Sequence, residues 1–115
     1  NRHAGFSLYD QDVFVNVIGG VKVHEPAADL AILLAVLSSF RNRGLPPGLA
    51  VFGEIGLTGE VRPVQRGLDR IKEVEKLGFT RLIMPQGNKS GIKSSKLDIV
   101  TVNNLEQAVR YAFDY

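Results

Sequence analysis

The sequence predicts an α/β (α+β) domain in which helices flank a sheet. Segments of strand length, marked by alternating or continuous apolar residues, are separated along the chain by segments with helical periodicity. The chain has 115 residues, of which 44% are hydrophobic, and this size suits one core. We therefore expect residues 1–115 to form a single domain.

The first predicted strand covers residues 12–18, where valine occupies every second position from Val13, and the Gly19-Gly20 pair then bends the chain. A helix is predicted next, because Pro26 suits a first helical turn. From Leu30 to Phe40 this helix has apolar residues on every side, so it must be covered all round. Its cover beyond the sheet would come from an N-terminal segment upstream of Asn1 or from a neighbouring subunit. The simpler interpretation is a helix buried in the domain's own core.

The second half of the chain continues the alternation of strand and helix. A helix at 66–77 is predicted by apolar residues three positions apart, which would form one buried stripe: Leu68, Ile71, Val74 and Leu77. The other predicted elements are a strand at 49–55 that turns back at 57–60 through Val61, strands at 81–85 and 99–102, a mobile loop at 86–96, and a last helix from 103 or 104 to about 113.

Composition excludes several classes of protein. The chain contains no cysteine, so disulfides and thiolate metal sites are excluded, which agrees with a cytoplasmic location. His3 and His24 stand alone, and a metal site is therefore not expected. No apolar run reaches the ~18 residues of a membrane span, and no signal-peptide pattern is present at the first residues, so no membrane partner is expected.

Two segments carry a family resemblance. Pro26-Ala27-Ala28-Asp29 opens the apolar helix, and residues 53–64 have the sequence of a strand, a tight turn and a return strand. They resemble the proteolytic domain of Lon-type ATP-dependent proteases, which implies a ribosomal protein S5 domain 2-like fold. In that family a catalytic serine stands at the position of Ala27, and the catalytic lysine falls on Leu68. Neither side chain can attack a carbonyl or accept a proton, so we expect a pseudo-peptidase without enzymatic activity.

Within the Lon-like group, the chain resembles the C-terminal domain of the RadA (Sms) family of bacterial DNA repair and recombination proteins. The matching segments are residues 12–23, 26–31, 34–41 and 51–64. An alternative is another degenerate Lon-like domain, such as the N-terminal part of a magnesium-chelatase-like ATPase. The long match at 12–23 favours RadA.

The RadA resemblance implies that this chain is a fragment without the zinc finger and RecA-like ATPase domain of the whole protein. We expect no cofactor in the fragment, whereas the full-length protein would be a DNA-dependent ATPase that uses ATP, Mg and Zn. The family also implies a homo-hexameric ring, the recombinase RecA as a partner, and a supporting role in branch migration of recombination intermediates.

Basic residues gather in the second half of the chain. The formal net charge is only +2, but residues 62–96 contain nine basic and three acidic side chains, a local net charge of +6. Such a patch favours sequence-independent contacts with the phosphates of duplex or branched DNA. The candidate contacts are Lys22, Arg62, Arg66, Arg70, Lys89, Lys93 and Lys96.

The basic residues are also compatible with interpretations that involve no DNA contact. The alternation of acidic and basic residues at 69–76 is also typical of an ordinary solvated helix face. The domain could equally be a ring-assembly scaffold or a protein-binding module that makes no DNA contact.

Overall fold

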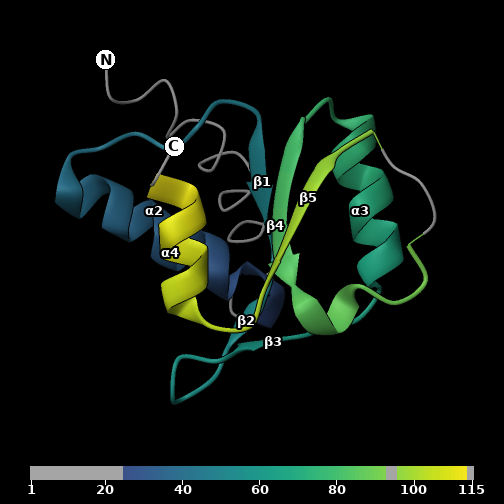
Figure 1. Ribbon diagram of the computed structural model, residues 1–115, viewed down its shortest axis with the longest axis horizontal. Helices are drawn as coiled ribbons and strands as arrows, with labels where there is room; N and C mark the ends of the chain where they lie inside the picture. The colour runs from purple at the N-terminus through teal and green to yellow at the C-terminus, as the bar shows by residue number, and fades with distance from the viewer. Residues whose placement is uncertain (1–24, 93–95, 114–115) are drawn as a thin grey trace.

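A three-stranded parallel sheet separates two layers of helix in the computed structural model of the chain (Figure 1). The structure describes residues 25–92 and 96–113. The strands are β1 (Leu49–Val51), β4 (Arg81–Pro85) and β5 (Asp98–Val102), and they lie in the order β1-β4-β5. β4 pairs in parallel with both neighbours and is therefore the central strand.

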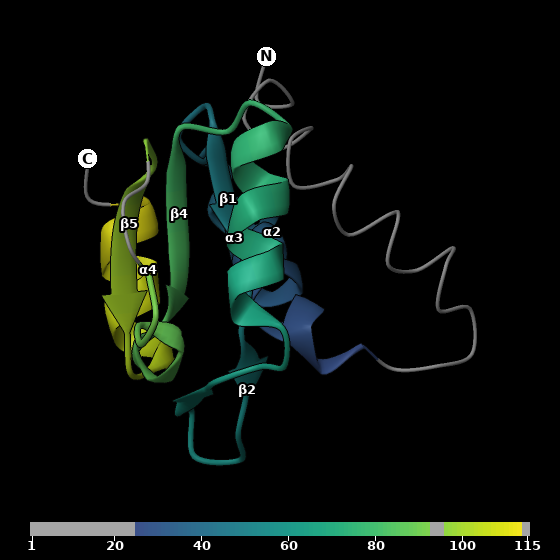
Figure 2. The same cartoon turned by 90° about the vertical axis from the view of Figure 1, so that its right-hand side faces the viewer.

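Helices cover both faces of this sheet. α2 (Asp29–Arg41) and α4 (Leu105–Phe113) lie on one face, and α3 (Gly67–Lys76) lies on the other (Figures 1 and 2). Because neighbouring side chains of a strand point to opposite faces, each strand contributes to two separate cores. In β4, Ile83 packs with the α2 and α4 side, whereas Leu82 packs with the α3 side. The predicted α/β class, with helices flanking a sheet, is confirmed.

A small hairpin projects from the end of the sheet (Figure 1). It consists of β2 (Glu54–Ile55) and β3 (Val61–Arg62), which pair antiparallel as a second sheet. The predicted strand at 49–55 is thus divided between two sheets. Gly53, at the break, has a φ of 155°, and a Cβ there would lie 3.1 Å from Val61 Cγ1 and 3.4 Å from Leu30 Cδ2. The chain can change direction there because glycine has no side chain.

The stripe predicted for α3 is only partly buried. Ile71 is buried and Val74 packs against the same core, but Leu68 and Leu77 are 45% and 64% exposed, so the prediction for these two is wrong. A spacing of three residues falls short of a 3.6-residue turn, and each step therefore rotates the side chain by about 60°. Across three steps the ends of the stripe lie about 180° apart. One helix face cannot bury them all.

One other prediction differs from the structure, and a further one falls on residues that the structure does not describe. Residues Gln86–Asn88 form the short 3-10 helix η2, where a mobile loop was expected, because Asn88 is hydrogen-bonded to the backbone of Val64. The predicted strand at 12–18, its glycine bend and the signals at the first residues lie outside the described residues.

α2 buries only one side. Leu30, Ala31 and Leu34 are fully buried against the sheet and α4. The opposite side carries three apolar residues at spacings of four, which are 38%, 56% and 87% exposed: Ile32, Val36 and Phe40. The expectation of all-round burial by the domain's own core is therefore not met among the described residues. We call these three residues the α2 stripe.

The two sides of α2 should respond differently to truncation. We expect Leu34→Ala to lower the free energy of unfolding by about 2 to 5 kcal/mol, because it removes a fully buried side chain and leaves a cavity. Val36→Ala should cost less than about 1 kcal/mol, since this side chain is 56% exposed. Urea melts of both variants give the comparison, and equal losses would show that the exposed side is covered in solution.

Candidate functional site

A cleft of about 500 Å³ opens beside Ala27. It lies between the short 3-10 helix η1 (Pro26–Ala28), β2, the segment that follows β3, and α3. Its apolar lining residues are Pro26, Ala27, Pro63 and Val64. Its polar lining residues are Glu25, Glu54, Gln65 and Arg70. The described lining therefore combines two carboxylates, one guanidinium and an apolar floor.

Local hydrogen bonds fix the η1 side of the cleft. The Glu25 carboxylate accepts a hydrogen bond from the Ala27 backbone N–H at 3.1 Å and so caps η1, while Pro26 supplies the helical φ of its first turn. The Gly53 N–H donates to the Ala27 carbonyl at 2.9 Å. Because Ala27 is held through both backbone groups, its methyl has a defined position in the wall.

The opposite wall is held by Asn88 of η2. The Asn88 side chain accepts from the Val64 N–H and donates to the Val64 carbonyl, both at 2.9 Å. Gly67, at the start of α3, makes room for this amide, because a Cβ at that position would stand 2.6 Å from Asn88 Nδ2. The backbone from Pro63 to Gln65 is thus clamped by a residue some twenty positions further along the chain.

The charged residues of the cleft differ in whether they face an opposite charge. Arg70 donates from Nε to the Gln65 carbonyl at 3.0 Å and faces Glu25 Oε2 at 3.7 Å. Glu54, on β2, forms no ion pair with any residue that the structure describes. Glu54 is half-buried. The cleft therefore holds one carboxylate without a cationic neighbour in the described part of the chain.

The two positions that the Lon resemblance assigns to the catalytic dyad are placed differently. Ala27 lines the cleft, whereas Leu68 is not among the lining residues and would lie 3.4 Å from a Cβ at Gly91. No described residue of the lining has a hydroxyl, thiol, imidazole or amine group. The described walls thus offer neither the hydroxyl nor the amine of a serine-lysine dyad.

Five of the seven predicted DNA contacts lie in the described residues, and these five fall into two groups. The arginines each face an acid: Arg62 pairs with Glu60 at 2.8 Å, Arg66 with Asp69 at 3.3 Å, and Arg70 with Glu25 at 3.7 Å. Lys89 and Lys96 are exposed and have no ion pair within the described ranges. Lys22 and Lys93 lie outside the described residues.

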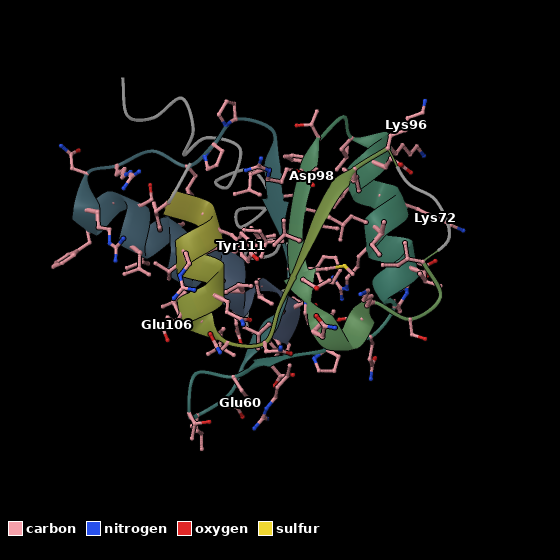
Figure 3. All side chains as sticks on the ribbon, viewed as in Figure 1. Glu60, Lys72, Lys96, Asp98, Glu106 and Tyr111 are labelled. Carbon is pink, nitrogen blue, oxygen red and sulfur yellow. The ribbon has the colours of Figure 1, made fainter. Side chains whose placement is uncertain are left out.

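Two further lysines belong with the second group. Lys72 and Lys76 are exposed on α3 and likewise form no ion pair with described residues. Figure 3 shows Lys72 and Lys96 on the same outer side of the molecule, beyond α3. Lys72 and Lys76 are four residues apart and therefore lie on one face of α3. This spacing was the sequence signal that could have identified them. We call Lys72, Lys76, Lys89 and Lys96 the lysine face.

The hairpin tip carries a strongly perturbed carboxylate. Hydrogen bonds, first from the Thr58 side chain, then from the backbone and from Arg62, lower the pKa of Glu60 from 4.5 to about 2. Arg62 donates through Nε at 3.1 Å and through a second nitrogen at 2.8 Å. Leu57, at the tip, is fully exposed. The exposed turn is thus ordered by hydrogen bonds to one charged side chain.

Residues 2–88 match a family model described as subunit ChlI of Mg-chelatase. The chain belongs to this family. The model bears the name of the magnesium-chelatase alternative considered from the sequence, and the individual relatives are DNA repair proteins named RadA.

These relatives match almost the whole chain. It is 54% identical to RadA of Pseudomonas aeruginosa over 99% of the chain, which is 25% of that protein. Identity to RadA of Escherichia coli is 52% over 95% of the chain, and to RadA of Bacillus subtilis 44% over 95%, in each case 24% of the relative. The predicted resemblance to RadA is confirmed. The chain spans about a quarter of the length of these relatives.

The described residues contain neither a membrane-spanning helix nor a group of metal ligands. None of their helices combines the length and hydrophobicity needed to cross a bilayer. Within the same ranges, no three His, Cys, Asp or Glu side chains are grouped so that they could hold a metal ion.

The Glu60 cluster predicts a specific acid sensitivity. A carboxylate whose pKa is lowered by folding stabilises the folded state above its ordinary pKa of 4.5, and this contribution is lost as pH falls toward about 2. We expect a carboxyl-carbon NMR titration to give Glu60 a midpoint near 2, and Thr58→Val to raise that midpoint. An unchanged midpoint in this variant would show that Thr58 does not hold the carboxylate.

Proposed function

We propose that this chain is a catalytically inactive Lon-like domain, with an S5-like fold, that contacts DNA without reading its sequence in a RadA-type repair protein. The observation that carries the proposal is the lysine face: four exposed cations without ion pairs in the described residues, two of them on α3 and a third, Lys96, on the same outer side of the molecule (Figure 3). The relatives' name, DNA repair protein, supports the choice of ligand.

The distinction between paired and unpaired cations matters for binding DNA. A free lysine that neutralises a phosphate releases a condensed counterion, and this release drives non-specific binding. An arginine already facing a carboxylate must give up part of that interaction first. Exposed ion pairs are worth only about 0 to 1 kcal/mol, so Arg62 and Arg66 can still contribute, but less than the lysines. We therefore assign the main phosphate contacts to the lysine face.

A second role, ring assembly, is supported by the α2 stripe. Three exposed apolar side chains aligned on one helix face are typical of a surface that another polypeptide covers. The stripe belongs to α2, whereas Lys72 and Lys76 of the lysine face belong to α3 on the opposite side of the sheet. One face can therefore hold a neighbouring subunit while the other contacts DNA.

The activities of the whole protein are part of the proposal. By analogy with the RadA family, ATP, Mg and Zn would be bound by parts of the protein other than this domain. The homo-hexamer, the RecA partner, the action on branched DNA and the cytoplasmic location have the same basis. The pseudo-peptidase role of Ala27 and Leu68 rests on the Lon resemblance.

The DNA interface predicts a change in salt dependence. In fluorescence anisotropy with a labelled duplex between about 50 and 200 mM salt, the slope of log K against log salt should fall by about 0.9 for each phosphate that the protein no longer neutralises. Replacing all four residues of the lysine face with alanine should therefore flatten the slope by up to about 3 to 4. Arg110→Ala, on the opposite helix layer, is the matched control and should leave it unchanged.

An unchanged slope in the fourfold variant would remove the lysine face from the interface. Absence of duplex binding by the unsubstituted protein at the lower salt concentration would contradict the DNA contact as a whole.

The assembly role has its own test. In the full-length protein, Val36→Asp combined with Phe40→Asp should lower the mass measured by light scattering, because charged groups in a buried interface are costly. Both residues are exposed in the domain, so far-ultraviolet circular dichroism should stay the same. A variant of unchanged mass would show that the α2 stripe is not a subunit interface.

A further inference from the structure

We propose that the cleft at Ala27 binds a lysine or arginine side chain on an extended segment of a partner protein, with Glu54 as its counter-ion. This inference goes beyond the DNA contact and the ring, and does not depend on either. It rests on three properties of the cleft: a carboxylate without an ion pair among the described residues, apolar walls held by hydrogen bonds, and Arg70 donors that no described residue occupies.

Glu54 supplies the charge. Glu54 is a half-buried residue that lines the cleft, and its carboxylate has no ion pair with any described residue, whereas the carboxylates of Glu25 and Glu60 each face an arginine. A charge partly removed from water is stabilised by an opposite charge at contact distance. A cationic group brought by a ligand would provide that interaction.

The walls suit the stem of a long basic side chain. Lysine and arginine carry an aliphatic stem that packs on apolar surface while the charged head is hydrogen-bonded. Pro26, Pro63 and Val64 offer such a surface at the cleft. The two prolines have fixed φ angles, and Val64 is clamped by Asn88. Little order would have to be imposed on these walls when a ligand binds.

Arg70 and the size of the cleft indicate a polypeptide. A guanidinium has five N–H donors, and Arg70 uses its Nε on the Gln65 carbonyl while its contact with Glu25 is long, at 3.7 Å. The remaining donors can bind a backbone carbonyl of the ligand. A volume of about 500 Å³ lies within the range of about 300 to 1,000 Å³ typical of ligand pockets, so residues beside the basic one also fit.

Other ligands fit the cleft less well. Two carboxylates against one guanidinium give the described lining a net negative charge, which disfavours the phosphates of DNA. The described residues hold no group of three ligands for a metal ion. The described lining has no hydroxyl, thiol or amine group, so we expect a bound segment to be held and not cut by a serine-lysine mechanism.

NMR titration of the ¹⁵N-labelled protein with two capped pentapeptides tests the proposal. One peptide has the sequence Ala-Val-Arg-Val-Ala, and the other replaces arginine with citrulline, which keeps the shape but removes the charge. We expect saturable shifts at the amides of Ala27, Glu54 and Val64 with the arginine peptide. The citrulline peptide should bind about tenfold more weakly or worse, as expected for a desolvated charge pair.

Glu54→Gln should abolish the difference between the two peptides. The matched control is Glu73→Gln, an exposed acid of α3 outside the cleft lining, which should preserve the difference. The proposal is overturned if the arginine peptide gives no saturable shifts at the cleft, or if both peptides bind equally to the unsubstituted protein. Because the peptide comparison needs no substitution, it decides the matter even if Glu54→Gln unfolds. No DNA is present, so the result is independent of the lysine face.

Discussion

The central strand β4 is the constraint on which the rest of the structure depends. It forms parallel ladders with both neighbours, and Leu82, Ile83 and Met84 are each fully buried. Because their side chains alternate between the two faces, one short strand supports both the core under α2 and α4 and the core under α3. The cleft depends on it too, since β4 leads directly into η2 and so places Asn88 against Val64.

Much of the fold could be predicted because its signals are local. The strand at 81–85 and the helix start at Pro26 depend on neighbouring residues, and both are found in the structure. The apolar stripe of α3 was overestimated because a spacing of three residues looks regular in the sequence but rotates around the helix. The break in the strand at Gly53 depends on contacts with Leu30 and Val61, which local periodicity does not reveal.

The candidate sites were less predictable, because they join distant segments. Positive charge could be counted, but whether a cation is free depends on its neighbours in space. Arg70 meets Glu25 across 45 positions of the chain, and no sequence pattern indicates this contact. The walls of the cleft come from four separate segments for the same reason. The acidic lining of the cleft and the lysine face therefore emerge only after folding, although both lie in one short chain.

The packing of Gly67 against Asn88 has a consequence for natural variation. Gly67 belongs to the first turn of α3 and is not among the residues that line the cleft. Even the smallest side chain there would displace the Asn88 amide and release the backbone at Val64. An inherited substitution at this glycine would thus resemble a ligand-binding defect while the lining residues stayed intact. Selection on the cleft would extend to a residue that never touches its ligand.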